Sequence, residues 1–432
     1  MSSHVLTVWN PEDEAFWQSS GKAIATRNLW ISIPALFLSF AVWMVWSVVV
    51  VNLPSIGFQY TTDQLFWLAA VPGLSGATLR IFYSFLVPIF GGRRWTTIST
   101  ASLLIPALGI GLAVQNNATP FSTMLILSLL CGFGGGNFAS SMANISFFYP
   151  KSQKGTALGL NAGLGNLGVS AVQFIVPIVI GFALFGGSSQ TATAADGTTR
   201  SLWLQNAAFV WVPLILASSI AAWFGMNDVS SARASFSDQA VIFRRKHNWI
   251  MCWLYLGTFG SFIGYSAALP LLIKSQFPEV NAVQFAFLGP LIGALSRPIG
   301  GWISDKLGGA PVTLWTFVVM ALAAGGVLWT LHGPFFLFLA IFIILFLATG
   351  VGNASTFRMI PLIFEPKEAA AVLGFSSAIG AYGGFFIPKS FGTSIAATGS
   401  PAAAIIGFIA FYVTCIAITW WYYARRGAEV AC

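Results

Sequence analysis

Two arginines inside apolar segments are the residues best suited to carry chemistry. Arg80 ends the string GATLR and Arg297 ends GALSR, and both lie far from the ends of apolar runs long enough to cross a membrane. An arginine at the centre of a bilayer costs at least about 2.5 kcal/mol, so such residues normally face a polar cavity on a substrate path. The alternative is packing or snorkelling. Two permanently charged forks of N–H donors suit a small planar oxyanion.

No carboxylate or histidine lies in the interior of a predicted span. Asp63, Glu279, Asp305, Glu365 and Glu368 all lie at span ends or in loops. The arginine pair therefore forms a site of about +2 that requires an anion, and closing it empty costs several kcal/mol. Proton-coupled carriers commonly use a titratable residue within the membrane. The pattern favours exchange of one anion for another, with proton symport as the alternative.

Aromatic and glycine-rich strings accompany the arginines. Tyr255 and Phe259 are four residues apart, on one face of a predicted helix, and Phe138 follows the string Gly134-Gly135-Gly136-Asn137. By pattern alone such aromatics are more often packing residues. The segments 159–168 and 374–384 allow close helix approach, and let Asn166 or backbone approach a small ligand. Their signature glycines are Gly159, Gly163, Gly165, Gly168, Gly374, Gly380, Gly383 and Gly384.

The elements that position these residues are membrane-spanning helices. Of the 432 residues 7% are charged, against roughly 25% in soluble domains, and 56% are hydrophobic. This composition excludes a water-soluble fold and predicts an all-α polytopic membrane protein. The four cysteines are far apart without metal-ligand spacing, so we expect no disulfide framework, metal or cofactor.

Twelve spans are predicted, and their basic residues orient them. Fourteen Lys and Arg fall on the side that holds both termini, against only Arg200 and Lys274 on the other, so both termini are predicted to be cytoplasmic. The net charge of +8 thus reflects topology and implies no nucleic-acid partner. The predicted spans are 29–52, 64–90, 96–115, 120–148, 156–185, 205–226, 248–273, 283–304, 311–331, 334–363, 369–395 and 401–424.

An internal repeat divides the spans into two six-helix halves. The strings around Arg80 and Arg297 recur at a shift of 217 residues, and the glycine strings recur at nearly the same shift. Transporters with parallel repeats bind substrate at the midplane between the halves. The predicted divisions are an N-terminal segment 1–28, a first half 29–226, a cytoplasmic linker 227–247, a second half 248–424 and a tail 425–432.

Other charged residues lie near span ends. Asp305 and Lys306 follow the eighth span in the string GWISDKLG, where a gate between the halves is plausible. Arg358 either lines the inner mouth or anchors its helix, and Lys389 is expected to snorkel to the interface. Thr61 and Asp63 have the spacing of a helix cap, so they are given no role in transport.

These strings resemble a known family. GWISDKLG is similar to the signature of the major facilitator superfamily. The two glycine strings, with ASSMANISFF (139–148) and SFLVPIFGGRRW (84–95), resemble the NarK-type nitrate/nitrite porters over nearly the whole chain. The resemblance implies that Arg80 and Arg297 clamp the anion, with Phe138, Tyr255, Phe259 and Asn166 in the pocket.

The resemblance also implies the substrate and the setting. It indicates nitrate and nitrite as exchanged substrates, alternating access between the two halves, and a bacterial inner membrane; we expect a monomer. The family includes proton-linked importers, so nitrate/proton symport stays open as an alternative. An anion channel or a nitrate sensor is a less favoured reading. No span combines a nucleophile, a base and an orienting group, so we expect no enzyme activity.

Overall fold

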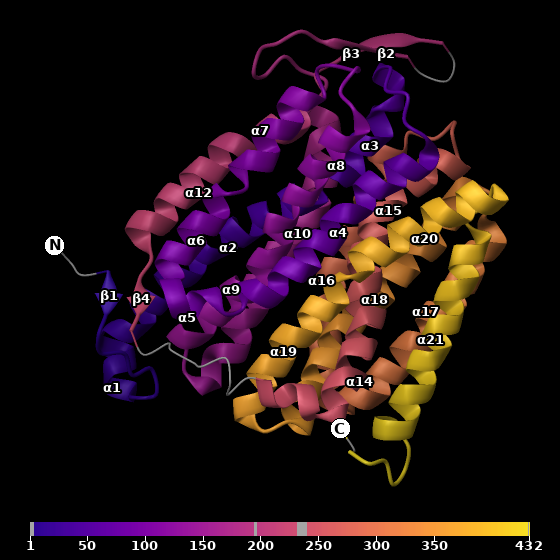
Figure 1. Cartoon of the computed structure of the whole chain (residues 1–432). Coiled ribbons are helices and arrows are strands. Elements are labelled where there is room, and N and C mark those ends of the chain that lie inside the picture. Colours follow the sequence, from indigo (N-terminus) through magenta and orange to yellow (C-terminus); the bar gives the residue numbers. More distant parts are fainter. Residues whose placement is uncertain (1–3, 194–196, 231–239, 431) are drawn as a thin grey trace.

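The computed structural model describes residues 4–193, 197–230, 240–430 and 432. Figure 1 shows an elongated bundle in which the earlier helices lie on the left and the later helices on the right. We call the first group (α2 to α12) the N-terminal bundle and the second (α14 to α21) the C-terminal bundle. The predicted linker 227–247 falls between the two groups in the sequence, and its residues 231–239 are outside the described part of the chain.

Most of the helical stretches that are broken by a short interruption belong to the N-terminal bundle. Its helices are α1 (Glu14–Phe16), η1 (Trp17–Gly21), α2 (Lys22–Met44), α3 (Trp46–Asn52), η2 (Pro54–Ile56), α4 (Thr62–Tyr83), α5 (Leu86–Phe90), α6 (Gly92–Ala101), α7 (Leu104–Ala113), α8 (Phe121–Leu130), α9 (Gly132–Phe148), α10 (Lys151–Val179), α11 (Asn206–Phe209) and α12 (Trp211–Gly225), with the segments before α2 included here.

The C-terminal bundle contains longer uninterrupted helices. Its helices are η3 (Ala240–Arg244), α14 (Lys246–Tyr255), η4 (Leu256–Gly260), α15 (Ser261–Gln276), η5 (Ala282–Gln284), α16 (Leu288–Leu307), α17 (Gly309–Thr330), α18 (Phe335–Ile363), α19 (Pro366–Ala381), α20 (Gly383–Thr398), α21 (Ala402–Thr419) and η6 (Trp420–Ala424), with η3 from the linker included here.

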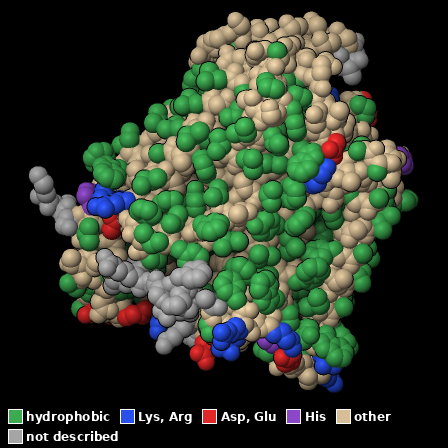
Figure 2. Space-filling model, viewed as in Figure 1, with side chains coloured by type: hydrophobic (Ala, Val, Ile, Leu, Met, Phe, Trp, Pro, Cys, Tyr) green, Lys and Arg blue, Asp and Glu red, His purple; other side chains and the backbone are tan. Residues whose placement is uncertain are grey.

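The helices bear out the predicted fold class. Eleven helical stretches among the described residues are long and apolar enough to cross a membrane. The remaining predicted span is α16, a helix of 20 residues that carries Arg297, Asp305 and Lys306 and is therefore less apolar. Figure 2 shows hydrophobic side chains over the middle of one face, with most of the charged side chains gathered toward its lower end. A lipid-facing belt has this composition.

Two small sheets mark opposite ends of the molecule. The strands β2 (Gln190–Thr193) and β3 (Thr199–Leu202) form an antiparallel hairpin at the top of Figure 1. The strands β1 (Val5–Leu6) and β4 (Asp228–Val229) pair in parallel, so the N-terminal segment is tied to the start of the linker. We call the two ends of the bundle the hairpin end and the termini end.

Several predicted boundaries differ from the structure. The first helical stretch runs from Glu14 to Asn52, so the predicted division at residues 28 and 29 falls inside it. The second predicted span is broken, because α4 stops at Tyr83 and the chain resumes as α5. Pro88 explains the break, since its ring clashes with the carbonyl of Ser84 and it has no N–H to donate. Arg80 therefore lies in the last turn of α4, not well inside a 27-residue helix as predicted.

The two bundles pack against each other at the hairpin end. Here α4 packs on α20 and α3 packs on α15. The contact between α4 and α20 is close enough for backbone to meet backbone: a Cβ added to Gly73 would overlap the carbonyl carbon of Gly384. Glycine at position 73 thus permits the approach that seals this end.

Candidate anion-binding site

Arg80 is completely buried at the boundary between the two bundles. Its Nε donates to the carbonyl oxygen of Gly135 on α9 at 2.9 Å, and its Nη1 donates to the carbonyl oxygen of Ser377 on α19 at 3.1 Å. One side chain thus bonds to backbone from both bundles. The two carbonyls hold the guanidinium in place without neutralising its charge.

The indole ring of Trp43 packs against the guanidinium of Arg80. The Arg80 guanidinium carbon lies 5.3 Å from the centre of the Trp43 ring, within cation–π range. The indole Nε1 donates to the carbonyl oxygen of Pro72 at 2.6 Å. A Cβ at Gly76 would lie 2.5 Å from the indole nitrogen, and one at Gly135 would lie 2.6 Å from Cε2 of the same ring. These two glycines make room for the indole.

Arg297 lies in the middle of α16 and is held by a phenol. Its Nη2 donates to the hydroxyl of Tyr255 at 3.1 Å. Its guanidinium carbon also lies 5.6 Å from the centre of the Phe357 ring. Tyr255 is fully buried and stacks on Phe357, with ring centres 4.2 Å apart and an angle of 14° between the planes. Phe357 was not predicted from the sequence, where no spacing distinguishes it from other phenylalanines.

A column of four aromatic rings connects the two arginines. Phe138 stacks on Phe259 at 6.4 Å, Phe259 on Tyr255 at 5.4 Å, and Tyr255 on Phe357. The Arg80 guanidinium carbon lies 4.8 Å from the Phe138 ring centre and 5.4 Å from that of Phe259. The structure thus brings these aromatics and the arginines together, while their role in binding an anion stays a prediction.

The backbone around Tyr255 and Phe259 is not a regular α-helix. The residues Leu256–Gly260 form one π-helical turn, η4, between α14 and α15. Single π-helical turns inside longer helices are frequent at functional sites. Here the wider turn places the rings of Tyr255 and Phe259 nearly parallel, with 9° between their planes.

Each arginine retains one buried donor that has no partner among the described residues. These are Nη2 of Arg80 and Nη1 of Arg297. Within the described part of the chain, neither guanidinium takes part in an ion pair. The two guanidiniums are also close enough to repel each other electrostatically. Two unsatisfied cationic donors at one place leave room for an acceptor that carries negative charge.

A large cavity reaches this site from the termini end. It has a volume of about 1340 Å³, and Phe138, Arg297 and Phe357 line its inner part. Asp305 and Arg358 line it further toward the termini end. Among the described residues, the cavity is bordered by both bundles, and α4 packs on α20 and α3 on α15 at the hairpin end, so the cavity opens toward the termini end.

The signature glycines fall into two groups. Gly165, Gly168, Gly380, Gly383 and Gly384 all face neighbouring helices closely: a Cβ at Gly380 would lie 2.7 Å from Cδ1 of Tyr255, for example. A Cβ at Gly159, Gly163 or Gly374 would have no neighbour within 4 Å, and these three line the cavity. The glycines of the first group allow neighbouring helices to pack closely. Those of the second group leave the cavity wall without protruding side chains at their positions.

Asn166 is placed differently from the other predicted pocket residues. It is 1% exposed on α10, and its Oδ1 has no hydrogen-bond partner among the described residues. In the part of the chain that the structure describes, no hydrogen bond joins Asn166 to Arg80 or Arg297. Its assignment to the pocket stays a prediction.

Of the two predicted gate residues, Asp305 lines the cavity. Asp305 accepts from Nε of Arg358 at 2.6 Å, and the Lys306 ammonium lies 3.9 Å from the Trp302 ring centre. Both contacts are within the C-terminal bundle. Arg358 is also among the residues that line the cavity, and whether it serves there or anchors its helix stays open.

Lys389 and Asp63 form an ion pair that the sequence does not predict. The Lys389 ammonium donates to Oδ1 of Asp63 at 2.7 Å and lies 4.6 Å from the centre of the Trp67 ring. Lys389 belongs to α20 and Asp63 to α4, so the ion pair joins the two bundles. The sequence does not reveal that these helices meet, so it does not predict this ion pair, and snorkelling of Lys389 to the interface stays a prediction. The capping box between Thr61 and Gln64 is confirmed.

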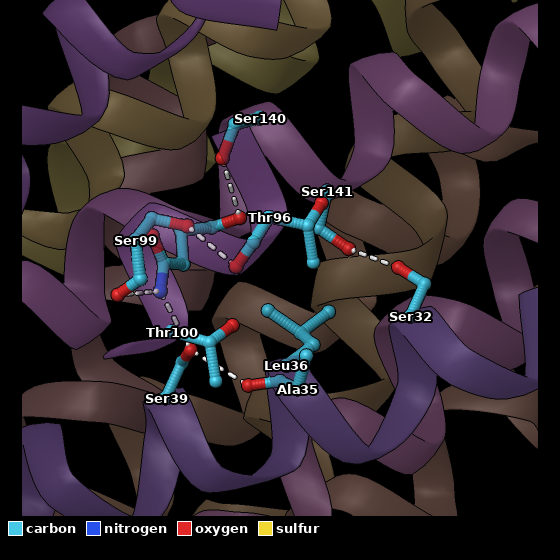
Figure 3. Close-up of a pocket in the computed structure, with 10 residues that line it drawn as sticks. Ser32, Ala35, Leu36, Ser39, Thr96, Ser99, Thr100, Ser140 and Ser141 are labelled. Atoms are coloured by element: carbon cyan, nitrogen blue, oxygen red, sulfur yellow. Dashed lines mark hydrogen bonds between the residues drawn. The ribbon is translucent and has the colours of Figure 1, made fainter. Parts of the chain in front are cut away.

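A second, much smaller cavity lies inside the N-terminal bundle. Figure 3 shows its polar lining, in which Ser32 hydrogen-bonds to Ser141 at 2.9 Å and Ser39 donates to the carbonyl of Ala35. Its volume of about 10 Å³ holds no more than about one water molecule. Asn137, the residue before Phe138, also lines it, and its Oδ1 has no hydrogen-bond partner among the residues that the structure describes. This cavity is too small for an oxyanion.

A bundle of membrane-spanning helices, with a cavity open on one side and a cation pair at the boundary of two bundles, is the architecture of a membrane transport protein. The chain belongs to the Major Facilitator Superfamily, whose family model matches residues 35–388.

Named relatives agree with this membership. The chain is 52% identical to "Nitrate/nitrite transporter NarU" of Escherichia coli (strain K12), covering 98% of this chain and 97% of the relative. It is 47% identical to "Probable nitrate/nitrite antiporter NarK2" of Thermus thermophilus, covering 99% and 98%. Among solved structures, a bacterial homologue of the human lysosomal transporter Spinster, inward-facing and unoccupied, matches with a TM-score of 0.65 at 16% identity, over 92% of this chain and 93% of that one. That likeness concerns the fold alone.

Proposed function

We propose that this protein exchanges nitrate for nitrite across a membrane, and that Arg80 and Arg297 hold the anion between the two bundles. The single observation that carries the site assignment is the pair of unsatisfied donors, Arg80 Nη2 and Arg297 Nη1. The substrate class is supported by the relatives, which are named as nitrate/nitrite transporters at up to 52% identity. The chain is accordingly a transporter and not an enzyme.

The four stacked aromatic rings give the anion site flat, apolar walls. Nitrate and nitrite are flat, and an anion between two planar guanidiniums lies best against flat rings. Phe138, Tyr255, Phe259 and Phe357 provide such surfaces, and the rings of Phe138 and Phe259 cover the guanidinium of Arg80, which is fully buried. Hydrogen bonds from a guanidinium to an anion are stronger where water is excluded.

A bound anion also changes the electrostatic energy between the two bundles. Arg80, from the N-terminal bundle, bonds to Ser377 of the C-terminal bundle, while Arg297 belongs to the C-terminal bundle. An anion that accepts from both arginines neutralises the repulsion between them. The loaded site can then close away from water at lower cost than the empty one, which favours movement of the bundles only with an anion bound.

The need to exchange one anion for another follows from the free-energy cost of closing the empty site away from water. An empty site of about +2 cannot discard its charge, because arginine is not deprotonated in proteins. Among the described residues, the cavity brings no carboxylate into contact with either guanidinium; Asp305 is occupied by Arg358. A second anion must therefore occupy the site for the return step, and nitrite fits because it is also a planar monoanion.

The proposed setting is a bacterial inner membrane, with both termini and the open cavity on the cytoplasmic side. The distribution of Lys and Arg supports this orientation, since the termini end carries most of them. The conformation is then inward-facing. We further propose that the N-terminal and C-terminal bundles move as the two repeat-related halves, that the protein functions as a monomer, and that no cofactor takes part.

The test is uptake of labelled nitrate into proteoliposomes. Vesicles are loaded with nitrite, with plain buffer, or with plain buffer and an inward proton gradient. We expect uptake only with internal nitrite. Uptake driven by the gradient without nitrite would replace antiport with proton symport, and uptake that does not saturate would indicate a channel. Binding of nitrate without uptake would support a sensor.

A further inference from the structure

The ion pair between Asp63 and Lys389 has no part in holding the anion. Asp63 lies in the first turn of α4, seventeen residues before Arg80, so the pair is about 25 Å from Arg80 along this helix. The ammonium and carboxylate are 2.7 Å apart, and their side chains are 24% and 32% exposed. A partly buried, short pair of this kind is screened less by salt than one fully in water.

The pair lies outside a set of contacts that seal the hairpin end. Further in along α4, Gly73 meets the backbone of Gly384, and the Thr78 hydroxyl lies 2.9 Å from the Tyr382 hydroxyl. These contacts, like the ion pair, run between α4 and the segment that includes α20. All of them must separate before an anion can enter from this end.

The ion pair is the most specific of these contacts. Trp67, on α4, covers the Lys389 ammonium at 4.6 Å, so a single lysine of the C-terminal bundle is held by two residues of the N-terminal bundle. Asp63 also borders Gly392, since a Cβ there would lie 3.3 Å from Oδ1 of Asp63. The lysine and the aspartate thus meet only when α4 and α20 are together.

We propose that Asp63 and Lys389 form a latch that holds the hairpin end closed and thereby sets how often the anion site faces that side. They are positioning residues: they act through the packing of α4 on α20 and do not touch the anion. This inference rests on the proposed transport function for its role in the exchange cycle. The latch itself is a claim about conformation and can be measured without transport.

The experiment measures how readily the hairpin end opens. Ser266 of α15 is fully buried on the sealed side, where its carbonyl accepts from Gln173 of α10 at 2.7 Å. The variant S266C keeps this backbone bond and introduces a thiol that a hydrophilic maleimide reaches only when the bundles part. The reaction is followed in purified protein in detergent, in a C432S background because Cys432 is not buried.

In this background we compare D63N, K389M and the charge-exchanged variant D63K/K389D. Loss of either charge should raise the labelling rate about two- to fivefold, the range expected for a partly exposed ion pair. The exchanged pair should bring the rate back toward that of the parent. The matched control is E429Q, which removes an ion pair with Lys246 inside the C-terminal bundle and should leave the rate unchanged.

Two results would overturn the latch: single variants that label at the parent rate, or a charge-exchanged variant that labels as fast as the single ones. Thermal unfolding of each variant shows that it is folded. In proteoliposomes, D63N and K389M should lower the KM for anion on the hairpin side more than they change the maximal rate. If labelling responds as expected while no vesicle takes up nitrate, the latch stands and the proposed function fails.

Discussion

Arg297 donates a hydrogen bond from Nη2 to the hydroxyl of Tyr255 at 3.1 Å, while its buried Nη1 has no partner among the described residues. The Tyr255 ring is fixed between Phe259 and Phe357, so its hydroxyl holds a set position. The hydrogen bond through Nη2 therefore fixes the direction in which Nη1 of Arg297 points. Arg80 is arranged in the same way, with two donors on carbonyls and one left free.

The first prediction concerns the shape of the two cations. R80K and R297K each keep the charge but lose the fork that bonds to fixed acceptors and to the anion together. A lost hydrogen bond to a charged group is worth about 1.5–3 kcal/mol, so nitrate/nitrite exchange should fall at least roughly tenfold. Exchange in proteoliposomes measures it. R94K, at an exposed arginine of α6, is the control, and equal activity in a folded R80K or R297K would refute the anion clamp.

The second prediction isolates the Tyr255 hydroxyl. Y255F keeps the stack with Phe259 and Phe357 but frees Arg297 to turn. We expect the KM for nitrate to rise about tenfold, because the donor is no longer aimed. Y60F removes a tyrosine hydroxyl bonded to the carbonyl of Thr119 at the hairpin end and serves as the matched control. The idea of an aimed arginine fails if both variants have the same KM.

The third prediction concerns the space around Trp43. G76A places a methyl group 2.5 Å from the indole nitrogen, so the ring that supports Arg80 must move. Overpacking of this kind costs about 1–3 kcal/mol, and the thermal unfolding midpoint should fall together with exchange. G325A, in the interior of α17 with no atom within 4 Å of its added Cβ, should leave the midpoint unchanged or raise it. A stable, active G76A would show that the indole has room to shift.

Sequence and structure agree most closely where a residue is unusual in its surroundings. Arg80, Arg297 and the glycine strings stand out because charge and glycine are conspicuous in apolar helices, and the fold class follows from composition. Phe357 and Trp43 do not stand out, because this chain contains 39 Phe and 17 Trp. Their roles depend on which helices are neighbours.

Long-range pairing explains the remaining differences. Asp63 and Lys389 are 326 residues apart, so no local pattern predicts their ion pair, and each was given a local role instead. The break after Tyr83 has a local cause in Pro88, but a proline within an apolar run is also compatible with a continuous, kinked helix. The sequence therefore predicts the correct helix for Arg80 but the wrong distance between Arg80 and the end of that helix.

The fourth prediction concerns pH. Arginine keeps its proton at all relevant pH values, and no carboxylate is in contact with either guanidinium in the described part of the chain. The exchange rate at saturating nitrate and nitrite should therefore change less than about twofold between pH 6 and pH 8, because nothing at the site titrates there. A pH-sensitive dye inside the vesicles should record no proton movement during exchange. Proton uptake in step with nitrate would require a carrier group elsewhere.

The last prediction concerns closure of the cavity. Gly163 on α10 lines the cavity, and a Cβ there would have no neighbour within 4 Å in this open conformation. G163L should therefore fold normally. For the anion to reach the hairpin end, however, the two bundles must come together around this wall, and a leucine would keep them apart. We expect exchange to fall at least about tenfold while nitrate still binds from the open side, since only the movement is blocked. Isothermal titration in detergent measures the binding, and G325L on α17, away from the cavity, is the control. Full exchange in G163L would show that α10 stays clear of the opposite bundle throughout the cycle.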